Sequence, residues 1–465
     1  MSAPYFTWSQ LGEICQGNYL LSPDTGLSSG VTAVWDDSRT VTPGSLFVAV
    51  KGEFQDGHRH ASSAVKSGAA ALCLQEAPSL AAQQELARLG VTCLLVEDSL
   101  AAFQALARAH RQKFPALLEL AITGSSGKTS TKEFCAAIFE QRWPGRVLKT
   151  QGNTNNHYGV PRNLLRLQEN HAAAVLELGS NHSGEIAQLA ALSSPSVALV
   201  SNIGAAHLEF FHDLEGVAKE KFSLFKALPP DGRAVFPYAA RNYASLKEAL
   251  KERKCLSFGD CIEADLCAEY LGYHEDGYRV RLTWKQSGIS KQFGWHIGGA
   301  HQAQNAAAAA AAATLIGMSP DEIVLGLQNA VLPGERMQVF QQAGITWCND
   351  AYNANPDSAL AALHWFAELS KNAKAQVAVL GDMRELGENS AQAHINLLQK
   401  ALEILPKARI VCVGEQIRAA AESLHMEHFT DLQSVKKIKS ELIDGSYVLL
   451  KASNGLKLYQ LPHEI

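Results

Sequence analysis

The chain has 465 residues, of which 47% are hydrophobic and 19% are charged, and its formal net charge is −5. This length exceeds what a single hydrophobic core supports, so several domains are expected. The slight negative charge argues against a nucleic-acid-binding surface, and no apolar run approaches the roughly 20 residues of a membrane span. The first ten residues lack the basic segment and apolar core of a signal peptide.

Nine cysteines are scattered through the chain without forming a C-x-x-C pair. Cys255, Cys261 and Cys267 are evenly spaced, but no His or Cys partner stands at metal-ligand spacing. We therefore predict reduced, mostly buried thiols and a cytoplasmic protein.

Residues 1–100 predict a small α/β domain. Helices are expected over 8–15 and 61–68, and strands over 45–50, 70–74 and 93–96. A turn-rich loop with Ser38, Arg39 and Lys51 can hold the anion of a nucleotide sugar. Solvated loop charges explain these three residues equally well.

Between residues 101 and 332, predicted strands and helices alternate, which favours a mostly parallel sheet with helices on both faces. The apolar strand 117–122 leads into a glycine-rich turn, and a helix follows over 132–141. Backbone N–H groups of such a turn, together with the positive end of the helix, form a phosphate site. The turn consists of Gly124, Ser125, Ser126, Gly127, Lys128, Thr129 and Ser130. In such a turn the lysine can meet the β- and γ-phosphates of ATP, and the threonine hydroxyl can bind Mg²⁺.

Two further polar residues end strands of the same predicted sheet. The strand 172–178 contains Glu177 at its end, and the strand 196–203 ends near His207. Ligands of open parallel sheets sit at the carboxyl ends of the strands, so Lys128, Glu177 and His207 are expected at one metal–nucleotide site. A structural role is the alternative for each of these residues taken alone.

The remaining chain predicts antiparallel strands over 270–295, a packed helix containing eight consecutive alanines at 306–313, and a third α/β unit from about 333. Two turns in that unit, 349–356 and 381–387, are dense in polar residues, and each follows a strand and precedes a helix. They can present groups into a cleft, although Asx-rich turns that cap helices explain them as well.

Together these strings resemble the Mur ligase family, the ATP-dependent enzymes of bacterial cell-wall precursor synthesis. The most specific strings are 123–130, 152–156, 177–182, 206–209, 350–356 and 381–387. The phosphate loop has Ile122 where the general pattern has a glycine, and this shorter form is the one that the family uses. The resemblance covers nearly the whole chain. It implies an α/β protein of three domains: a UDP-substrate-binding domain at 1–100, a central P-loop ATP-binding domain with a mostly parallel sheet at 101–332, and a C-terminal Rossmann-like ligase domain at 333–465.

The resemblance also implies roles for individual residues. Lys128 and Thr129 would hold the phosphates and a first Mg²⁺, while Glu177 and His207 would serve two expected Mg²⁺ ions. ATP would also meet Asn305, Arg336 and Asp350. The UDP-peptide would lie along Ser38, Arg39, Thr40, Asn155 and Asn156, and the incoming amine near Tyr352, Asn353, Asn355 and Asp382.

Lys221 matches the lysine that relatives carbamylate, which would make it a further Mg²⁺ ligand and a catalytic residue. An unmodified, solvated lysine is the alternative. The chain departs from the family pattern at Ala452 and Asn454, where relatives usually carry glycine and arginine. It also lacks an arginine often found just before His301.

The resemblance implies an ATP-dependent ligase that joins D-alanyl-D-alanine to UDP-N-acetylmuramoyl-tripeptide through an acyl phosphate. The string 352–356 favours addition of a dipeptide. The alternatives are a Mur-type ligase for a single amino acid, a folylpolyglutamate-type ligase, and an ATP-dependent regulatory protein that uses the loop as a switch. We expect small-molecule substrates, no nucleic-acid or membrane partner, and a monomer.

Overall fold

A computed structural model describes residues 4–24, 28–52, 55–204, 208–251, 253–274, 277–334 and 336–463. The predicted site residue His207 lies outside these described residues. The chain forms two compact units. The first comprises 1–117, 150–172 and 191–194, and the second comprises 118–149, 173–190 and 195–465. None of the described helices combines the length and apolar character needed to cross a lipid bilayer.

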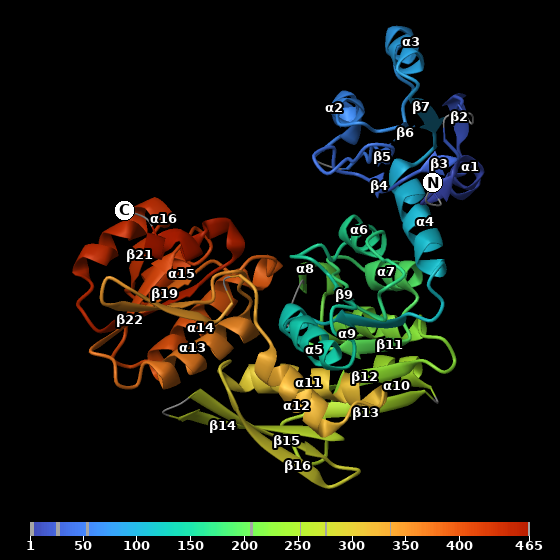
Figure 1. Cartoon of the computed structure of the whole chain (residues 1–465). Coiled ribbons are helices and arrows are strands. Elements are labelled where there is room, and N and C mark those ends of the chain that lie inside the picture. Colours follow the sequence, from blue (N-terminus) through green and yellow to red (C-terminus); the bar gives the residue numbers. More distant parts are fainter. Residues whose placement is uncertain are drawn as a thin grey trace. The chain divides into compact units, whose positions relative to one another are not determined.

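The first unit is built on a five-stranded sheet (Figure 1). Its strand order is β2 (Asn18–Leu21), β7 (Thr92–Leu95), β6 (Ala71–Leu74), β5 (Leu46–Val48) and β4 (Val34–Trp35). A separate two-stranded ribbon pairs β1 (Phe6–Thr7) with β3 (Gly30–Val31). The helices of this unit are α1 (Trp8–Cys15), α2 (Ala61–Lys66), α3 (Leu80–Arg88), α4 (Ser99–Gln112) and α6 (Gly159–Leu164). Helix α1 has the predicted bounds, and a capping box between Thr7 and Gln10 fixes its start.

The second unit contains a nine-stranded sheet in which the seven strands β8 to β14 run parallel, and β15 and β16 extend it by antiparallel pairing from β14. The order is β16 (Ile289–Trp295), β15 (Gly277–Trp284), β14 (Leu266–His274), β13 (Lys254–Gly259), β12 (Arg233–Pro237), β11 (Val197–Val200), β8 (Leu118–Thr123), β10 (Ala173–Glu177) and β9 (Val147–Lys149). This mixture matches the predicted parallel sheet with an antiparallel extension. The central position of β8 places the end of that strand between the ends of β10 and β11.

Helices α5 (Lys128–Arg142) and α11 (Ala300–Leu315) pack against each other and into the core of this sheet. All eight alanines at 306–313 have 0% exposure, because their small side chains allow close contact with the neighbouring elements. The predicted packed helix is therefore confirmed. The other helices around this sheet are α8 (Leu208–Phe211), α9 (Leu214–Lys226), α10 (Ala244–Leu250) and α12 (Pro320–Asn329), and α7 (Glu185–Ser193) is divided between the two units.

A six-stranded sheet completes the second unit and is parallel apart from the β17–β18 pair. Its order is β17 (Gln338–Gln342), β18 (Ile345–Asn349), β22 (Ser446–Lys451), β19 (Ala375–Gly381), β20 (Arg409–Val413) and β21 (Glu427–Phe429). Its helices are α13 (Pro356–Leu369), α14 (Ser390–Ile404), α15 (Arg418–Ser423) and α16 (Leu432–Val435). The predicted α/β class, with a C-terminal Rossmann-like part, is confirmed. The boundaries 1–100, 101–332 and 333–465 stay predictions.

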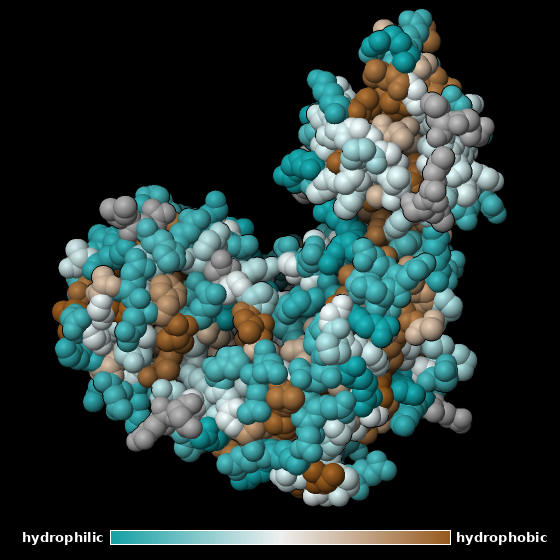
Figure 2. All heavy atoms as spheres, viewed as in Figure 1, coloured by the Kyte–Doolittle hydropathy of each residue, from teal (hydrophilic) through white to brown (hydrophobic). Residues whose placement is uncertain are grey.

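The face shown in Figure 2 is mostly hydrophilic, and its apolar residues form scattered patches. Among the most exposed large apolar side chains are Leu80, Val331 and Ile262, each far from the others in the sequence. All nine cysteines are free, and six of them are buried. The predicted buried thiols are thus confirmed for most of the nine.

Candidate active site

The glycine-rich turn joins β8 to α5, as predicted. Helix α5 begins at Lys128 rather than at the predicted residue 132, so Lys128, Thr129 and Ser130 belong to its first turn. Gly127 is the N-cap of α5 and has φ of +75°, a conformation that glycine adopts without strain. A methyl group placed on Gly127 would lie 2.3 Å from Asn305 Oδ1. The structure therefore packs Asn305 directly against the loop, and the predicted contact of Asn305 with adenine stays a prediction.

The segment after β11 holds the same turn from the other side. Ser126 donates its backbone N–H to Asn202 Oδ1 over 2.6 Å, and the Ser201 hydroxyl donates to the Ser126 carbonyl over 2.5 Å. Ser125 exchanges two hydrogen bonds of 3.0 Å with the backbone of Gly204. These contacts fix the loop geometry before any ligand arrives, which lowers the entropic cost of binding a phosphate.

Lys128 lies half-buried at the start of α5, and its ammonium donates to the Gly124 carbonyl over 2.7 Å. Burial lowers the pKa of Lys128, and the nearby Arg336 acts in the same direction. The carboxylates of Glu177 and Glu385 oppose that shift. A cation that protein burial destabilises gains more from a phosphate anion than a solvated lysine does.

Thr129 and Glu177 meet beside Lys128. The Thr129 hydroxyl donates to Glu177 Oε2 over 2.9 Å, and Arg336 also donates to that hydroxyl over 3.2 Å. Hydroxyl and carboxylate oxygens are the ligands that Mg²⁺ accepts next to nucleotide phosphates. The pair therefore fits a Mg²⁺ ion chemically, and the structure brings the three predicted residues Lys128, Thr129 and Glu177 together.

Lys221 lies in α9 with only 1% of its surface exposed. Its ammonium donates to the Ser180 hydroxyl over 2.8 Å. Burial, followed by the charge of Lys128, lowers the pKa of Lys221 to about 7, although Glu220 and Glu185 oppose the shift. The alternative of a solvated lysine is wrong, because the side chain is buried near the phosphate loop.

Asp350 follows β18 and forms an ion pair of 2.5 Å with Lys451 at the end of the neighbouring strand β22. It also accepts a hydrogen bond from the Met337 backbone over 3.2 Å. Burial lowers the pKa of His301 to about 4, while Asp350 opposes that shift. Lys451, which matches the lysine of the family pattern, thus has a structural partner in Asp350. The neighbouring Ala452 and Asn454 depart from that pattern.

The polar turns of the C-terminal part contain both exposed side chains and side chains that accept hydrogen bonds from the backbone. Tyr352 stacks under the Arg336 guanidinium at 3.7 Å, and Asn353 is exposed. Asn355 caps α13 by accepting from Ser358 N–H over 2.8 Å, and Asp382 accepts from Ile417 N–H over 3.0 Å. Helix capping therefore accounts for one of the proposed substrate groups, as the alternative interpretation expected.

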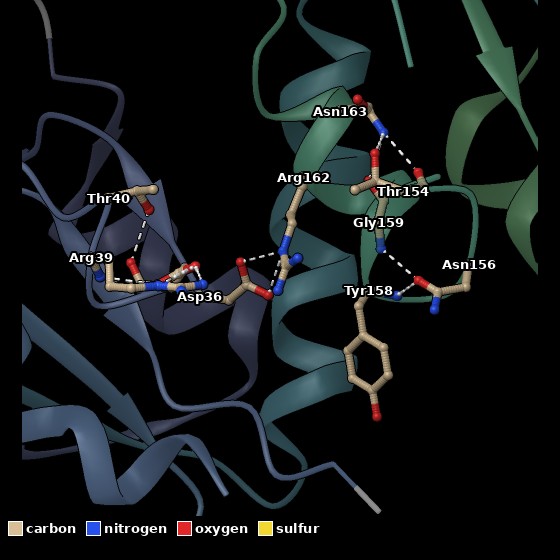
Figure 3. Close-up of polar contacts among 10 residues, drawn as sticks. Asp36, Arg39, Thr40, Thr154, Asn156, Tyr158, Gly159, Arg162 and Asn163 are labelled. Atoms are coloured by element: carbon tan, nitrogen blue, oxygen red, sulfur yellow. Dashed lines mark hydrogen bonds and ion pairs between the residues drawn. The ribbon is translucent and has the colours of Figure 1, made fainter. Parts of the chain in front are cut away.

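In the first unit, the predicted loop residues Ser38, Arg39 and Thr40 form a turn. Arg39 pairs with Asp37 at 2.6 Å and is 86% exposed, and the Thr40 hydroxyl donates to the Asp37 carbonyl (Figure 3). Their solvated state agrees with the simpler alternative and leaves the arginine accessible to an anion.

Sequence reasoning missed the ion pair beside this turn. Arg162 of α6 reaches both carboxylate oxygens of Asp36 through its Nε, at 2.8 and 2.9 Å, and the Asp36 side chain is only 5% exposed (Figure 3). The two residues are 126 positions apart. An isolated Arg and an isolated Asp carry no sequence signal that would pair them.

Asn163 organises the loop that contains Asn155 and Asn156. Its buried amide donates to the Thr154 carbonyl, the Thr154 hydroxyl and the Gly159 carbonyl over 2.8–2.9 Å (Figure 3). Asn156 Oδ1 in turn accepts from the Gly159 N–H over 2.9 Å. These hydrogen bonds hold the asparagine-rich loop in one conformation. The sequence analysis did not predict this role of Asn163, because the residues around it show only the pattern of a helix.

A pre-shaped phosphate loop at the carboxyl edge of a parallel sheet, with a hydroxyl–carboxylate pair beside it, defines a P-loop nucleotide-binding protein. Three family models match consecutive parts of the chain: the Mur ligase family catalytic domain (residues 31–111), the Mur ligase middle domain (122–313) and the Mur ligase glutamate ligase domain (335–454). The chain belongs to the Mur ligase family, whose members are ATP-dependent amide-bond-forming ligases.

Individual relatives resemble the chain over nearly its full length. A UDP-N-acetylmuramoyl-tripeptide–D-alanyl-D-alanine ligase from Escherichia coli (strain K12) is 37% identical and covers 91% of this chain and 90% of its own. The crystal structure of MurF from Acinetobacter baumannii superimposes with a TM-score of 0.86 at 32% identity, over 98% of this chain and 97% of that one. The structure of MurF ligase from Thermotoga maritima in complex with ADP superimposes with a TM-score of 0.78 at 26% identity, over 93% of this chain and 96% of that one. The predicted family resemblance is thereby confirmed.

Proposed function

We propose that the chain is an ATP-dependent ligase that joins D-alanyl-D-alanine to UDP-N-acetylmuramoyl-tripeptide in peptidoglycan precursor synthesis. The observation that carries this proposal is the 37% identity to a ligase of that name over 91% of the chain. The ADP complex of a structural neighbour supports nucleotide binding by this chain. By this proposal, residues 1–100 hold the UDP end of the substrate, 101–332 bind ATP, and 333–465 bring the amine.

The chemistry begins when the terminal carboxylate of the tripeptide attacks the γ-phosphate of ATP, which yields an acyl phosphate and ADP. Lys128 compensates the negative charge that develops on the transferred phosphoryl group, and the backbone N–H groups at the start of α5 hold its oxygens. The amine of the dipeptide then attacks the acyl carbon, and phosphate leaves. Exclusion of water protects the acyl phosphate from hydrolysis.

Thr129 and Glu177 are the described residues that would hold Mg²⁺, and the ion would neutralise phosphate charge there. Two ions are predicted, with His207 and, once it is carbamylated, Lys221 as the further ligands. Small-molecule substrates, a monomeric state and a cytoplasmic location complete the proposal. They agree with the free cysteines and with a surface without a continuous apolar patch on the face shown.

The proposal is tested by phosphate release from ATP in the presence of Mg²⁺ and UDP-N-acetylmuramoyl-tripeptide, with and without D-alanyl-D-alanine. We expect release that depends on both substrates, because the acyl phosphate must pass its acyl group to an amine. Release with ATP alone contradicts a ligase and favours the switch alternative. Release that depends on a single amino acid or a folate instead assigns the chain to a related ligase.

We propose further that Lys221 is carbamylated. Carbon dioxide reacts with a neutral amine, and a pKa of about 7 makes half of this buried amine neutral near pH 7. The amine nitrogen forms a bond to the carbon of carbon dioxide and releases one proton to solvent, and the resulting carbamate carries a negative charge that the ammonium of Lys128 stabilises. A solvated lysine would remain almost fully charged at the same pH.

Carbamylation predicts a slow-exchanging carbamate carbon signal in ¹³C NMR after equilibration with ¹³C-bicarbonate. At a fixed concentration of dissolved carbon dioxide, the signal should grow between about pH 6 and about pH 8, because the neutral amine fraction rises with pH. Lys221→Met should abolish it, whereas Lys226→Met, which changes an exposed lysine on the same helix, should not. A signal that survives Lys221→Met, or none in the wild type, contradicts the modification.

A further inference from the structure

Asp357 brings a carboxylate from the C-terminal part to the edge of the phosphate loop. It occupies the first turn of α13, directly after Pro356. A methyl group placed on Gly204 would lie 2.2 Å from Asp357 Oδ2 and 3.3 Å from Asn202 Nδ2. The carboxylate therefore covers the backbone of Gly204, which is buried at the end of the β11 segment.

Gly204 is itself bound to the phosphate loop. The Ser125 hydroxyl donates to the Gly204 carbonyl and accepts from its N–H, both over 3.0 Å. The neighbouring Asn202 accepts the Ser126 N–H. Only one layer of backbone thus separates the Asp357 carboxylate from the loop that holds the transferred phosphoryl group.

Among the residues that the structure describes, none binds the Asp357 carboxylate. Within the described ranges, no hydrogen bond or ion pair involves its oxygens. The start of α13 already has its own cap, because Asn355 and Ser358 form a reciprocal capping box. The residue is exposed, so water or a ligand reaches it, while the protein atoms around its carboxyl raise the pKa of Asp357 by desolvation.

We propose that Asp357 binds the ammonium group of the incoming amine and removes its proton before the amine attacks the acyl phosphate. This role rests on the proposed ligase function. An amine of this kind is protonated near neutral pH and has no lone pair for attack. A carboxylate at the edge of the phosphate loop, carried by the part of the chain that brings the amine, is placed to supply the missing base.

The step balances. The ammonium gives one proton to the carboxylate, which becomes a carboxylic acid, and the freed lone pair forms the C–N bond. The C–O bond to phosphate breaks, and the phosphate leaves with its electron pair. The nitrogen loses a second proton to the departing phosphate or to water, and Asp357 returns its own proton to solvent after product release.

The test compares two acceptors in the intact enzyme. D-alanyl-D-alanine needs deprotonation, whereas hydroxylamine is largely neutral near pH 7 and captures the acyl phosphate as a hydroxamate without a base. Asp357→Asn is expected to slow dipeptide ligation by about 100-fold or more, with the loss in kcat rather than in the KM for ATP. Hydroxamate formation should stay within about threefold of the wild type.

Asp321→Asn is the matched control, because Asp321 also follows a proline in the first turn of a helix, α12. It should leave both reactions unchanged, which separates the proton transfer from an effect on the helix terminus. Dipeptide ligation by Asp357→Asn within about threefold of the wild type overturns the inference, and so does an equal loss of hydroxamate. If the wild type forms hydroxamate but no dipeptide product, D-alanyl-D-alanine is not the acceptor. The proposed role of Asp357 toward its amine is then also wrong.

Discussion

Lys128→Ala is expected to reduce dipeptide-dependent phosphate release by about 10²–10³-fold, the range found when one donor to a developing negative charge is removed. The ammonium of Lys128 donates to the Gly124 carbonyl, so the structure holds this cation against the phosphate loop. Because burial already disfavours this cation, its interaction with the transferred phosphoryl group is strong in the transition state. The measurement is kcat at saturating ATP, together with the KM for each substrate.

Lys226→Ala serves as the matched control, since Lys226 forms an exposed ion pair with Glu248 on the surface of the same unit. Its activity should equal that of the wild type. Circular dichroism of both variants should remain native-like, because neither change removes a core side chain. Substantial activity in Lys128→Ala would falsify the assignment of the phosphate loop as the site of transfer.

Glu177→Gln is expected to lower activity by about 100-fold or more at limiting Mg²⁺, with partial recovery as Mg²⁺ is raised. The amide of glutamine can still accept the hydrogen bond from the Thr129 hydroxyl, so the local geometry survives. What is lost is the negative charge, and a neutral amide is a much weaker ligand for a hard cation. The measurement is the apparent Mg²⁺ affinity from the metal dependence of phosphate release.

The control for this change is Glu248→Gln, which removes an exposed carboxylate from the pair with Lys226. It should not alter the metal dependence. An unchanged Mg²⁺ requirement in Glu177→Gln would assign Glu177 a purely structural role, as the hydrogen-bond partner of Thr129. The site would then have to recruit its metal through the phosphates and other residues.

Much of the fold follows from local sequence patterns. Apolar runs alternating with helical stretches predicted the strands β8, β10 and β11, because a strand that is buried on both faces needs an uninterrupted apolar sequence. The phosphate loop could also be predicted from the sequence, because its strand, glycine-rich turn and helix are contiguous in the chain. Helix α1 has the predicted bounds, and in the structure the Thr7 cap and the buried face of the helix define it locally.

Local sequence patterns did not predict the hydrogen-bond partners of Asn355 and Asp382. Both lie in polar turns that resemble substrate loops, yet Asn355 caps α13 and Asp382 accepts the Ile417 N–H. The residue type alone does not show whether a side-chain oxygen accepts a hydrogen bond from the backbone or binds a ligand. Their proposed contacts with the amine substrate stay predictions.

The sequence by itself determined the class of chemistry, because the phosphate loop is one contiguous segment whose backbone geometry depends on its own glycines. Only the tertiary structure decided which distant residues meet within each of the two units. Arg336 meets Thr129 across 207 positions, Asp36 meets Arg162 across 126, and Asp357 lies against Gly204. Such pairs depend on the order of strands in a sheet and on how its loops converge, and that order results from packing over the whole chain rather than from any local pattern.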